Sequence, residues 1–545
     1  MKKRVIAIMI SIIFLYSSIL AVNAQVKIKQ DNIKKSEYWG EVIPIRVAIY
    51  TNEEETSEDY YNPSGRTRYF LYALSDYSWK AGDNHYVFVP KIVTTDDIIN
   101  GELTKENYDV FLHTPCQGDE YLFTHGFKNL PQNILRVQKI KNFVKSGGGY
   151  FGTCAGAQAA ANMKNQPKTF FELMMKRSSF GISAVEYEYC MAMPYFCQFT
   201  KAGFERIGQM GYIQYSGWNI SNLHYNYHSG VCVNSVINHN NPIFDDLHED
   251  TRLVRWISGP SLDFPADPDR EIKVLASYPD EEISDNESVQ IHHWKYTGGL
   301  AGLIKAAFKG DGEIQYWERY GIFMRAFVFA KDWEMTDKMV TTNLSGKNMM
   351  TYEIYPNDNK ARIILNGGHP EMNVWWGGEI QEKVDDENNT IYDAFHHWVN
   401  VTSEEETIED EFSYNYWMIR RCVAWVSQRV PVNELPVVYG KSEVCDFVNS
   451  TVNESNFVIN GNVEKGQGTV SVDLYYRYSS DNSTWTNWTF FGNHIVNYEE
   501  NSWEFTSPNG SGYYQFYSIR KVNNEAGTEV EKAPPCYDAE IRVMS

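Results

Sequence analysis

A cysteine between two glycines is the sharpest chemical feature of the sequence. Gly152 and Gly156 flank Cys154 at spacing G-x-C-x-G, after a short apolar run and before an Ala-rich stretch, Ala155 to Met163. At a tight strand-to-helix turn a side chain projects above the sheet, and the glycines let backbones pass where a Cβ would clash. Free N–H groups at the start of a helix also favour a thiolate. The pattern predicts a nucleophile elbow carrying Cys154; the competing interpretation is a buried structural cysteine at a Gly-rich turn.

A thiol nucleophile needs a base, and His369 with Glu371 is the candidate pair. They follow an apolar run, Arg362 to Leu365, and a glycine turn. At the carboxyl edge of a parallel sheet, an imidazole there would meet a nucleophile from another strand, and Glu371 would orient the ring. With 13 histidines and 70 acidic residues, chance His-x-acid pairs are expected, and His248 with Asp250 is one. That second pair lacks a preceding strand, so position favours His369.

The elements that would position these residues alternate along the chain. Apolar runs predict strands and amphipathic spacing predicts helices, which argues for an α/β doubly wound parallel sheet with helices on both faces. Residues 165–360 give no clear pattern beyond short strand-like runs. The expected strands are 45–50, 86–90, 108–113, 150–151, 272–276, 321–329 and 362–365. The expected helices are 63–74, 134–144, 155–163 and 412–430, with a short helix and loop at 94–103.

The last part of the chain has a different pattern of apolar and polar residues. Pro431 and Pro436 mark a linker, and alternating runs at 470–476 and 513–519 are separated by Gly, Asn and Ser turns. Such alternation over about 110 residues predicts a β-sandwich. It is similar to the Ig-like modules of prokaryotic, especially archaeal, surface proteins, which implies a spacer or an adhesive surface that contacts cell-surface glycans or proteins.

The N-terminus predicts export. Basic residues 2–4, an uncharged run 5–22 and small residues before Gln25 are the parts of a secretory signal peptide, with an uncleaved anchor as the alternative. Asn-X-Ser/Thr sequons recur along the chain and agree with a secreted or cell-surface glycoprotein. We therefore divide the chain into a signal peptide (1–24), an α/β domain (25–432) and a β-sandwich domain (433–545).

Composition narrows the choice of partners. A net charge of −21 argues against nucleic acid, because phosphate binding needs clustered Lys and Arg. None of the eight cysteines has C-x-x-C spacing, and we expect neither a metal nor another cofactor. Outside the cytoplasm some cysteines should form disulfides, and Cys190 with Cys197 or Cys445 with Cys536 are candidate pairs.

Two motifs together carry a family resemblance. Gly-Gly-Gly-Tyr-Phe-Gly-Thr-Cys-Ala-Gly-Ala at 147–157 with Gly-Gly-His-Pro-Glu at 367–371 resembles the class I glutamine amidotransferase-like superfamily, closest to the biotin–protein ligase N-terminal-domain-like family. The resemblance spans roughly residues 43–430. It implies a flavodoxin-like sheet and a triad of Cys154, His369 and Glu371. It does not imply ligation, because no sequence resembling a ligase catalytic domain accompanies the motifs and extracytoplasmic space lacks ATP.

One motif departs from that family. Its usual Pro-Gly-Gly loop is here Pro115-Cys116-Gln117-Gly118, so the backbone N–H groups of Cys116 or Gln117, with that of Ala155, are the candidate oxyanion hole. The change also brings a second thiol toward Cys154. A Cys116–Cys154 disulfide would silence or gate the nucleophile; alternatively, Cys116 pairs elsewhere or stays reduced.

The remaining histidine motif concerns the substrate. His228, Ser229 and Gly230 are expected to line the substrate cleft, since the family's segment there often runs near the nucleophile. His224 and His228 have i, i+4 spacing, but the segment does not resemble a helix, which disfavours a metal site.

The sequence thus predicts a secreted cysteine hydrolase, or amidase, acting on a small-molecule, peptide or envelope-derived amide. The alternative is a catalytically silent envelope-associated binding or structural protein that keeps the fold, which a Cys116–Cys154 disulfide would favour. A peptidase of the intracellular-protease branch fits less well, because that branch has His directly after the nucleophile and Ala155 stands there.

Overall fold

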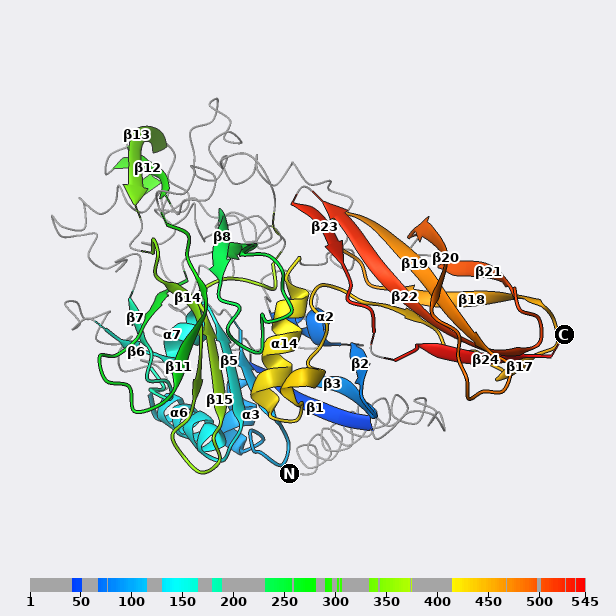
Figure 1. Ribbon diagram of the computed structural model, residues 1–545. Coiled ribbons are helices and arrows are strands. Elements are labelled where there is room, and N and C mark those ends of the chain that lie inside the picture. The colour runs from blue at the N-terminus through cyan, green and yellow to red at the C-terminus, as the bar shows by residue number, and fades with distance from the viewer. Residues whose placement is uncertain are drawn as a thin grey trace, which may run out of the picture.

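The fold has two parts, which we call the α/β part (Val42 to Ser427) and the C-terminal β part (Ser442 to Val543) (Figure 1). The computed structural model describes residues 42–50, 67–75, 77–114, 130–164, 179–188, 231–256, 259–280, 290–296, 301–302, 304–305, 333–341, 344–372, 374, 414–466, 468–496, 501–524, 526–534 and 536–544.

A ten-stranded sheet forms the centre of the α/β part, in the order β2-β3-β1-β4-β5-β15-β14-β11-β8-β9. Five adjacent strands run parallel, which confirms the predicted parallel sheet: β3 (Asn84–Val93), β1 (Val42–Tyr50), β4 (Val110–His113), β5 (Gly149–Thr153) and β15 (Arg362–Asn366). The sequence did not predict the antiparallel extension on both sides, made of β2 (Ser78–Ala81), β14 (Asn348–Ile354), β11 (Ile272–Ser277), β8 (Val231–Ile237) and β9 (Thr251–Trp256).

Helices cover both faces of this sheet. Along β1, Ile45, Val47 and Ile49 enter one core and Ala48 and Tyr50 the other, because successive strand residues point to opposite faces. The first core includes α2 (Thr67–Leu74) and α14 (Tyr416–Ser427), and the second includes α3 (Thr95–Asn100), α6 (Leu130–Lys145) and α7 (Ala155–Ala160).

Two expected helices are shorter than predicted. The helix expected to reach residue 163 ends at Ala160, because β6 (Asn162–Met163) pairs with β7 (Glu186–Glu188). The last helix ends at Ser427, because Gln428 takes a left-handed conformation with φ 59°. The smaller remaining elements of this part are β10 (Ser261–Asp263), which pairs with β7, and the ribbon of β12 (Gln290–Tyr296) and β13 (Trp333–Thr341). A 3-10 turn, η6 (Val432–Glu434), lies between the two parts. The strand-like run expected at 321–329 lies outside the described residues.

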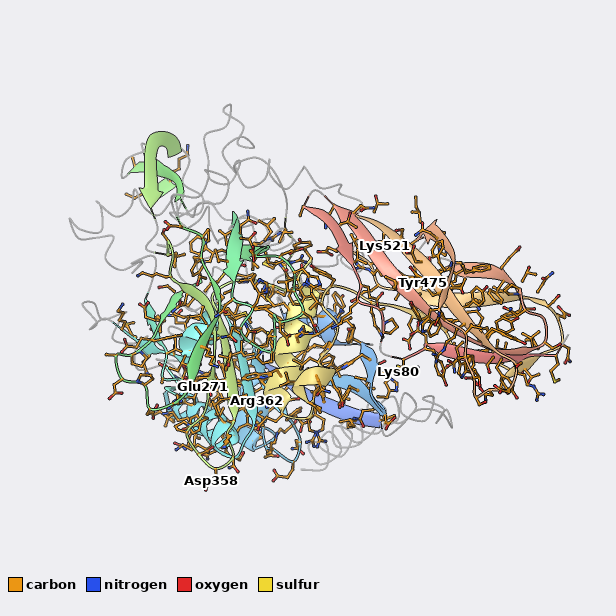
Figure 2. All side chains as sticks on the ribbon, in the orientation of Figure 1. Lys80, Glu271, Asp358, Arg362, Tyr475 and Lys521 are labelled. Atoms are coloured by element: carbon orange, nitrogen blue, oxygen red, sulfur yellow. The ribbon has the colours of Figure 1, made fainter. Side chains whose placement is uncertain are left out.

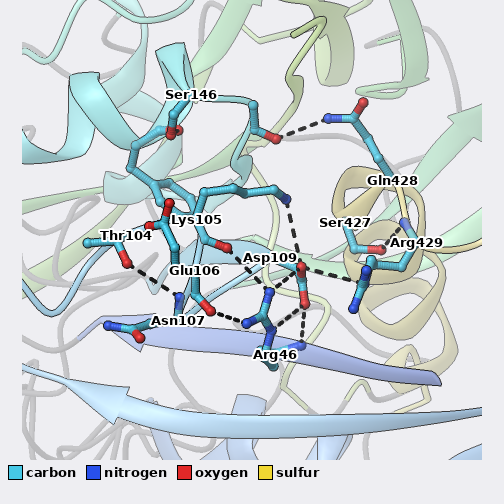
Figure 3. Close-up of polar contacts among 12 residues, drawn as sticks. Arg46, Thr104, Lys105, Glu106, Asn107, Asp109, Ser146, Ser427, Gln428 and Arg429 are labelled. Atoms are coloured by element: carbon cyan, nitrogen blue, oxygen red, sulfur yellow. Dashed lines mark hydrogen bonds and ion pairs between the residues drawn. The ribbon is translucent and has the colours of Figure 1, made fainter. Parts of the chain in front are cut away.

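Asp109, just before β4, joins β4 to β1 at the amino edge of the parallel strands (Figure 3). Arg46 of β1 donates to its carboxylate from the backbone N (3.0 Å), from Nε (3.0 Å) and from Nη2 (2.9 Å). Lys105 Nζ lies 3.7 Å and Arg429 Nε lies 3.6 Å from Oδ1 of Asp109. Burial works against a charged Asp109, but the hydrogen bonds and charge of Arg46 outweigh it and hold the pKa of Asp109 below its usual range.

The C-terminal β part consists of two sheets around one core, and the predicted all-β character is confirmed. Residues of both sheets, such as Ile459, Trp503, Leu474 and Phe516, are buried together in that core. One sheet holds β16 (Ser442–Val444), β18 (Asn456–Val463) and β21 (Ser502–Thr506); the other holds β17 (Thr451–Val452), β24 (Ala539–Val543), β22 (Gly512–Asn524), β19 (Thr469–Ser479), β20 (Thr489–Ile495) and β23 (Gly527–Val530).

Polar contacts join the two parts directly. Trp79 Nε1 of the α/β part donates at 2.7 Å to the carbonyl of Glu434, in the segment between the two parts. Lys80, which Figure 2 shows at the junction, lies 3.6 Å from the carboxylate of Glu443. Lys532 of the C-terminal β part donates to Asp246 at 2.8 Å. The boundary at 432–433 stays a prediction, but several contacts cross it.

The predicted Cys445–Cys536 pair is not bonded: both residues are free thiols, as are Cys154 and Cys422. Burial raises the pKa of both Cys445 and Cys536, and neighbouring carboxylates add to it. A raised pKa keeps each thiol in its protonated, less reactive form. Cys190 and Cys197 lie outside the described residues. Within the described ranges, no helix is both long and apolar enough to cross a membrane.

Candidate active site

Cys154 occupies a strained turn between β5 and α7. Its backbone has φ 50° and ψ −111°, a conformation that L-residues rarely adopt and that costs about 1–3 kcal/mol. The turn is held on both sides: Cys154 N donates to the carbonyl of Asn366 at 2.7 Å, and Gln158 N donates to the carbonyl of Cys154 at 3.1 Å. Cys154 is not part of a disulfide, and the residue is 8% exposed. The local geometry is that of a strand-to-helix elbow that presents a side chain at the edge of the sheet.

The two glycines around Cys154 are required by close backbone approach. A Cβ on Gly156 would lie 2.2 Å from the carbonyl oxygen of His113, at the end of β4. A Cβ on Gly152 would lie 2.7 Å from the carbonyl group of Gly156. Real Cβ atoms do not approach backbone atoms this closely, so any larger residue would push the elbow away from the sheet.

Three backbone N–H groups of the loop after β15 donate hydrogen bonds that hold the loop in place. Gly367 N donates to Met349 on β14 (2.7 Å), and Gly368 N donates to Oδ1 of Asn366 (2.8 Å). His369 N donates to the carbonyl of Arg255 on β9 at 2.8 Å. Because the carbonyl of Asn366 also binds Cys154 N, one residue connects the loop to the elbow.

The three predicted triad residues lie together in this loop and elbow. His369 Nδ1 lies 2.7 Å from Glu371 Oε1, with both side chains fully buried, and the ring also hydrogen-bonds to Cys154. Since Nδ1 faces Glu371, Nε2 is the nitrogen left for the thiol. Burial opposes a charged ring, but the negative charges of Glu371 and Cys154, with hydrogen bonds to both, raise the pKa of His369 to about 9.

A second histidine at this edge cannot act as a base near neutral pH. His113 ends β4, is fully buried, and its Nδ1 lies 3.1 Å from the carbonyl of Thr114. Burial, with a contribution from the charge of Arg136, lowers the pKa of His113 to about 3. The ring is therefore neutral and packs against the aromatic rings of Tyr50 and Phe180.

The structure separates the other sequence-predicted residues into two groups. Ala155 begins α7 directly after the nucleophile, where its backbone N–H was predicted to serve. Cys116, Gln117 and the predicted cleft residues His228, Ser229 and Gly230 lie outside the described residues. Among the residues that are described, no group of three His, Cys, Asp or Glu side chains could hold a metal ion.

In the competing pair of His248 and Asp250, the Asp250 carboxylate lies 3.5 Å from the ring of His239. Glu249 between them accepts a hydrogen bond from Tyr439 (3.1 Å) and pairs with Arg252 (3.2 Å), so the segment contacts β9 and the chain that links the two parts.

Two residues of the site were not anticipated from the sequence. Asn366 and Arg255 supply the carbonyls that hold Cys154 and His369 in place. The Asn-Gly-Gly turn marked Asn366 as a turn residue, but no pattern in the sequence indicated Arg255, whose role depends on tertiary contact.

Comparison of the sequence with protein-family models and with curated proteins found no match. The interpretation of the site therefore depends on its geometry: a strained thiol, an imidazole held by a carboxylate, and backbone N–H groups at a helix start. Groups in this arrangement can transfer an acyl group through a covalent thioester.

Proposed function

We propose that this chain is a secreted or cell-surface cysteine hydrolase that cleaves an amide or a related acyl bond. One observation carries the proposal: the imidazole of His369 bonds at once to Glu371, at 2.7 Å, and to the thiol of Cys154 on a strained elbow. A nucleophile, a base and a group that orients the base are the three roles that acyl transfer through a thioester needs.

In the proposed reaction, His369 Nε2 already holds the proton of the thiol, because its pKa is about 9, and Cys154 Sγ attacks the substrate carbonyl carbon as the thiolate. The backbone N–H of Ala155, with those of Cys116 or Gln117, stabilises the oxyanion. His369 then gives the proton to the leaving amine as the C–N bond breaks, which leaves a thioester on Cys154. Water, deprotonated by His369, attacks the thioester, and its collapse releases the carboxylic acid and restores the thiol. Glu371 holds the ring through Nδ1 throughout.

The strand order supports the class of fold behind this proposal. Taken in chain order, the five parallel strands lie in the sheet as second, first, third, fourth and fifth, an order that supports a flavodoxin-like sheet. Ligands of such sheets bind beyond the carboxyl ends of the strands, the edge where Cys154 and His369 lie. We infer membership of the class I glutamine amidotransferase-like superfamily from this order together with the two motifs, and an Ig-like class for the C-terminal β part.

Labelling with iodoacetamide under reducing conditions near pH 7, followed by peptide mapping, tests the nucleophile. Cys154 should react faster than the half-buried thiol of Cys445, which serves as an internal control. The variant Cys154→Ala should abolish hydrolysis of model amides and esters, with a loss of about 10⁴-fold or more. Labelling of another cysteine while Cys154 stays unmodified would refute the assignment and favour a silent binding protein.

A further inference from the structure

The catalytic loop is held by a strand at the far end of the sheet. β9 is separated from β15 by three strands in the sheet order, yet its residue Arg255 bridges to His369, whose N–H donates to the Arg255 carbonyl at 2.8 Å. The chain after β9 also supports this loop, because Trp256 Nε1 fixes the carbonyl of Gly259 (2.9 Å), and Gly259 packs directly against Gly367. The position of His369 therefore depends on the position of β9.

Three residues before Arg255, β9 carries a fully buried cation. Arg252 Nε donates to Oδ1 of Asn415 (3.0 Å), Nη2 donates to the carbonyl of Tyr414 (2.6 Å), and the guanidinium lies 3.2 Å from the centre of the Tyr414 ring. Burying such a charge is unfavourable unless acids lie beside it.

The closest acid comes from the other part of the molecule. Glu529 on β23 places its carboxylate 2.7 Å from Arg252 Nη1, with the Glu529 side chain 9% exposed. Glu249 of the α/β part is farther away, at 3.2 Å, and more open to solvent, with 35% of its side chain exposed. Glu529 is therefore the main counter-charge that keeps Arg252 buried.

We propose that the C-terminal β part is a positioning element for the catalytic histidine, acting through the Glu529–Arg252 ion pair and β9. The proposal goes beyond an adhesive or spacer role for this part. It rests on the proposed function only in using the reactivity of Cys154 as a readout. Without the Glu529 charge, Arg252 must move toward water or toward Glu249, and β9 with the Arg255 carbonyl moves with it.

The test compares two full-length variants that each remove one ion pair between the two parts. Glu529→Gln removes the pair that reaches β9 and preserves the side-chain shape. Lys532→Ala removes the Lys532–Asp246 pair, which is exposed and, among the residues that the structure describes, lies outside β9. Iodoacetamide labelling of Cys154 should slow roughly ten-fold in Glu529→Gln, because a small displacement of the base is costly to a reactive pair. It should stay within about two-fold of wild type in Lys532→Ala.

A folded Glu529→Gln variant with the wild-type labelling rate, or an equal slowing in Lys532→Ala, overturns the proposal. Native-state hydrogen exchange of the unmodified chain decides the case in which Glu529→Gln does not fold. The His369 amide should then lose protection together with the Ser442 and Arg520 amides, which bind Glu531 in the C-terminal β part. Full protection of His369 while those amides exchange overturns the proposal. An unreactive Cys154 in wild type would contradict the proposed function alone and leave hydrogen exchange as the test of the positioning role.

Discussion

The two edges of the parallel sheet each bury a carboxylate, and they satisfy it in different ways. At the amino edge, both oxygens of Asp109 accept hydrogen bonds from Arg46. At the carboxyl edge, Glu371 uses Oε1 for His369, while Oε2 has no hydrogen-bond partner among the described residues. Neither Arg46 nor Asp109 has a positive φ, whereas Cys154 at the carboxyl edge does.

The cations beside these two carboxylates explain why the amino edge stabilises the fold and the carboxyl edge is suited to catalysis. Arg46 stays charged at any physiological pH, so its pair with Asp109 is permanent and fastens β1 to β4. His369 gains and loses a proton, so its pair with Glu371 can change charge during a reaction. Asp109, whose two oxygens both accept hydrogen bonds from a permanent cation, stabilises the fold. Glu371, which has one oxygen without a hydrogen-bond partner among the described residues and a neighbour that can lose its proton, is suited to catalysis.

The largest effect should follow from filling the space under the elbow. In Gly156→Ala the new Cβ would lie 2.2 Å from the His113 carbonyl, which is backbone and has no freedom to rotate away. We expect a loss of at least about 3 kcal/mol in the free energy of unfolding, measured by denaturant titration.

Gly492 is the matched control, because a Cβ there would meet no heavy atom within 4 Å. Gly492→Ala should change the free energy of unfolding by less than about 1 kcal/mol. Equal stability of the two alanine variants would show that the elbow does not need its close approach to β4.

The two edges should also have opposite pH signatures. The pKa of His369 is about 9 in the folded chain, above its ordinary 6.5. Its stabilisation is therefore complete below pH 6.5 and is lost as pH rises through about 9, on the order of 3 kcal/mol in all. The pKa of Asp109 is held below its ordinary value, so its contribution is present above about pH 4 and is lost as pH falls.

Unfolding titrations from pH 3 to pH 10 would measure both contributions. His369→Asn should flatten the alkaline limb of the stability profile and leave the acid limb unchanged. A wild-type alkaline limb in that variant would mean that other groups, not the His369 ring, set the loss above pH 7.

Local patterns in the sequence predict the parallel strands and the elbow well, because both depend on neighbours in the chain. Apolar runs mark β1, β4 and β5, and the spacing of Gly152 and Gly156 reports a steric need at the turn. The pair Arg252 and Glu529 could not be predicted, since 277 positions separate residues that only the tertiary fold brings to 2.7 Å. The same holds for Arg255, which contributes a carbonyl that every residue possesses.

The next smaller effect concerns the amino edge. Asp109→Asn removes the charge beside Arg46, whose side chain is 30% exposed and can gain partial hydration. We expect the free energy of unfolding to fall by about 2 kcal/mol, less than for a fully buried pair. Labelling of Cys154 should keep its wild-type rate once folding is complete, and a slowed rate would show that the two edges are coupled.

The smallest effect on stability should come from Glu371→Gln, although the residue is as buried as Asp109. The reason is the partner: without the carboxylate His369 can release its proton and remain as a neutral ring, whereas Arg46 has no neutral form to adopt. We expect a loss of about 1 kcal/mol at pH 8.5, where most of the stabilisation by the charged His369 ring has already been lost. Alkylation of Cys154 should be roughly ten-fold slower, since an uncharged ring no longer stabilises the thiolate. Measured side by side, Asp109→Asn should cause the larger loss of stability and preserve the reactivity of Cys154. Glu371→Gln should cause the smaller loss of stability and slow the reaction of Cys154. A different result would contradict this: Glu371→Gln lowers stability as much as Asp109→Asn while Cys154 reacts at the wild-type rate. Glu371 would then only stabilise the fold, and its contact with His369 would have no effect on the chemistry of the site.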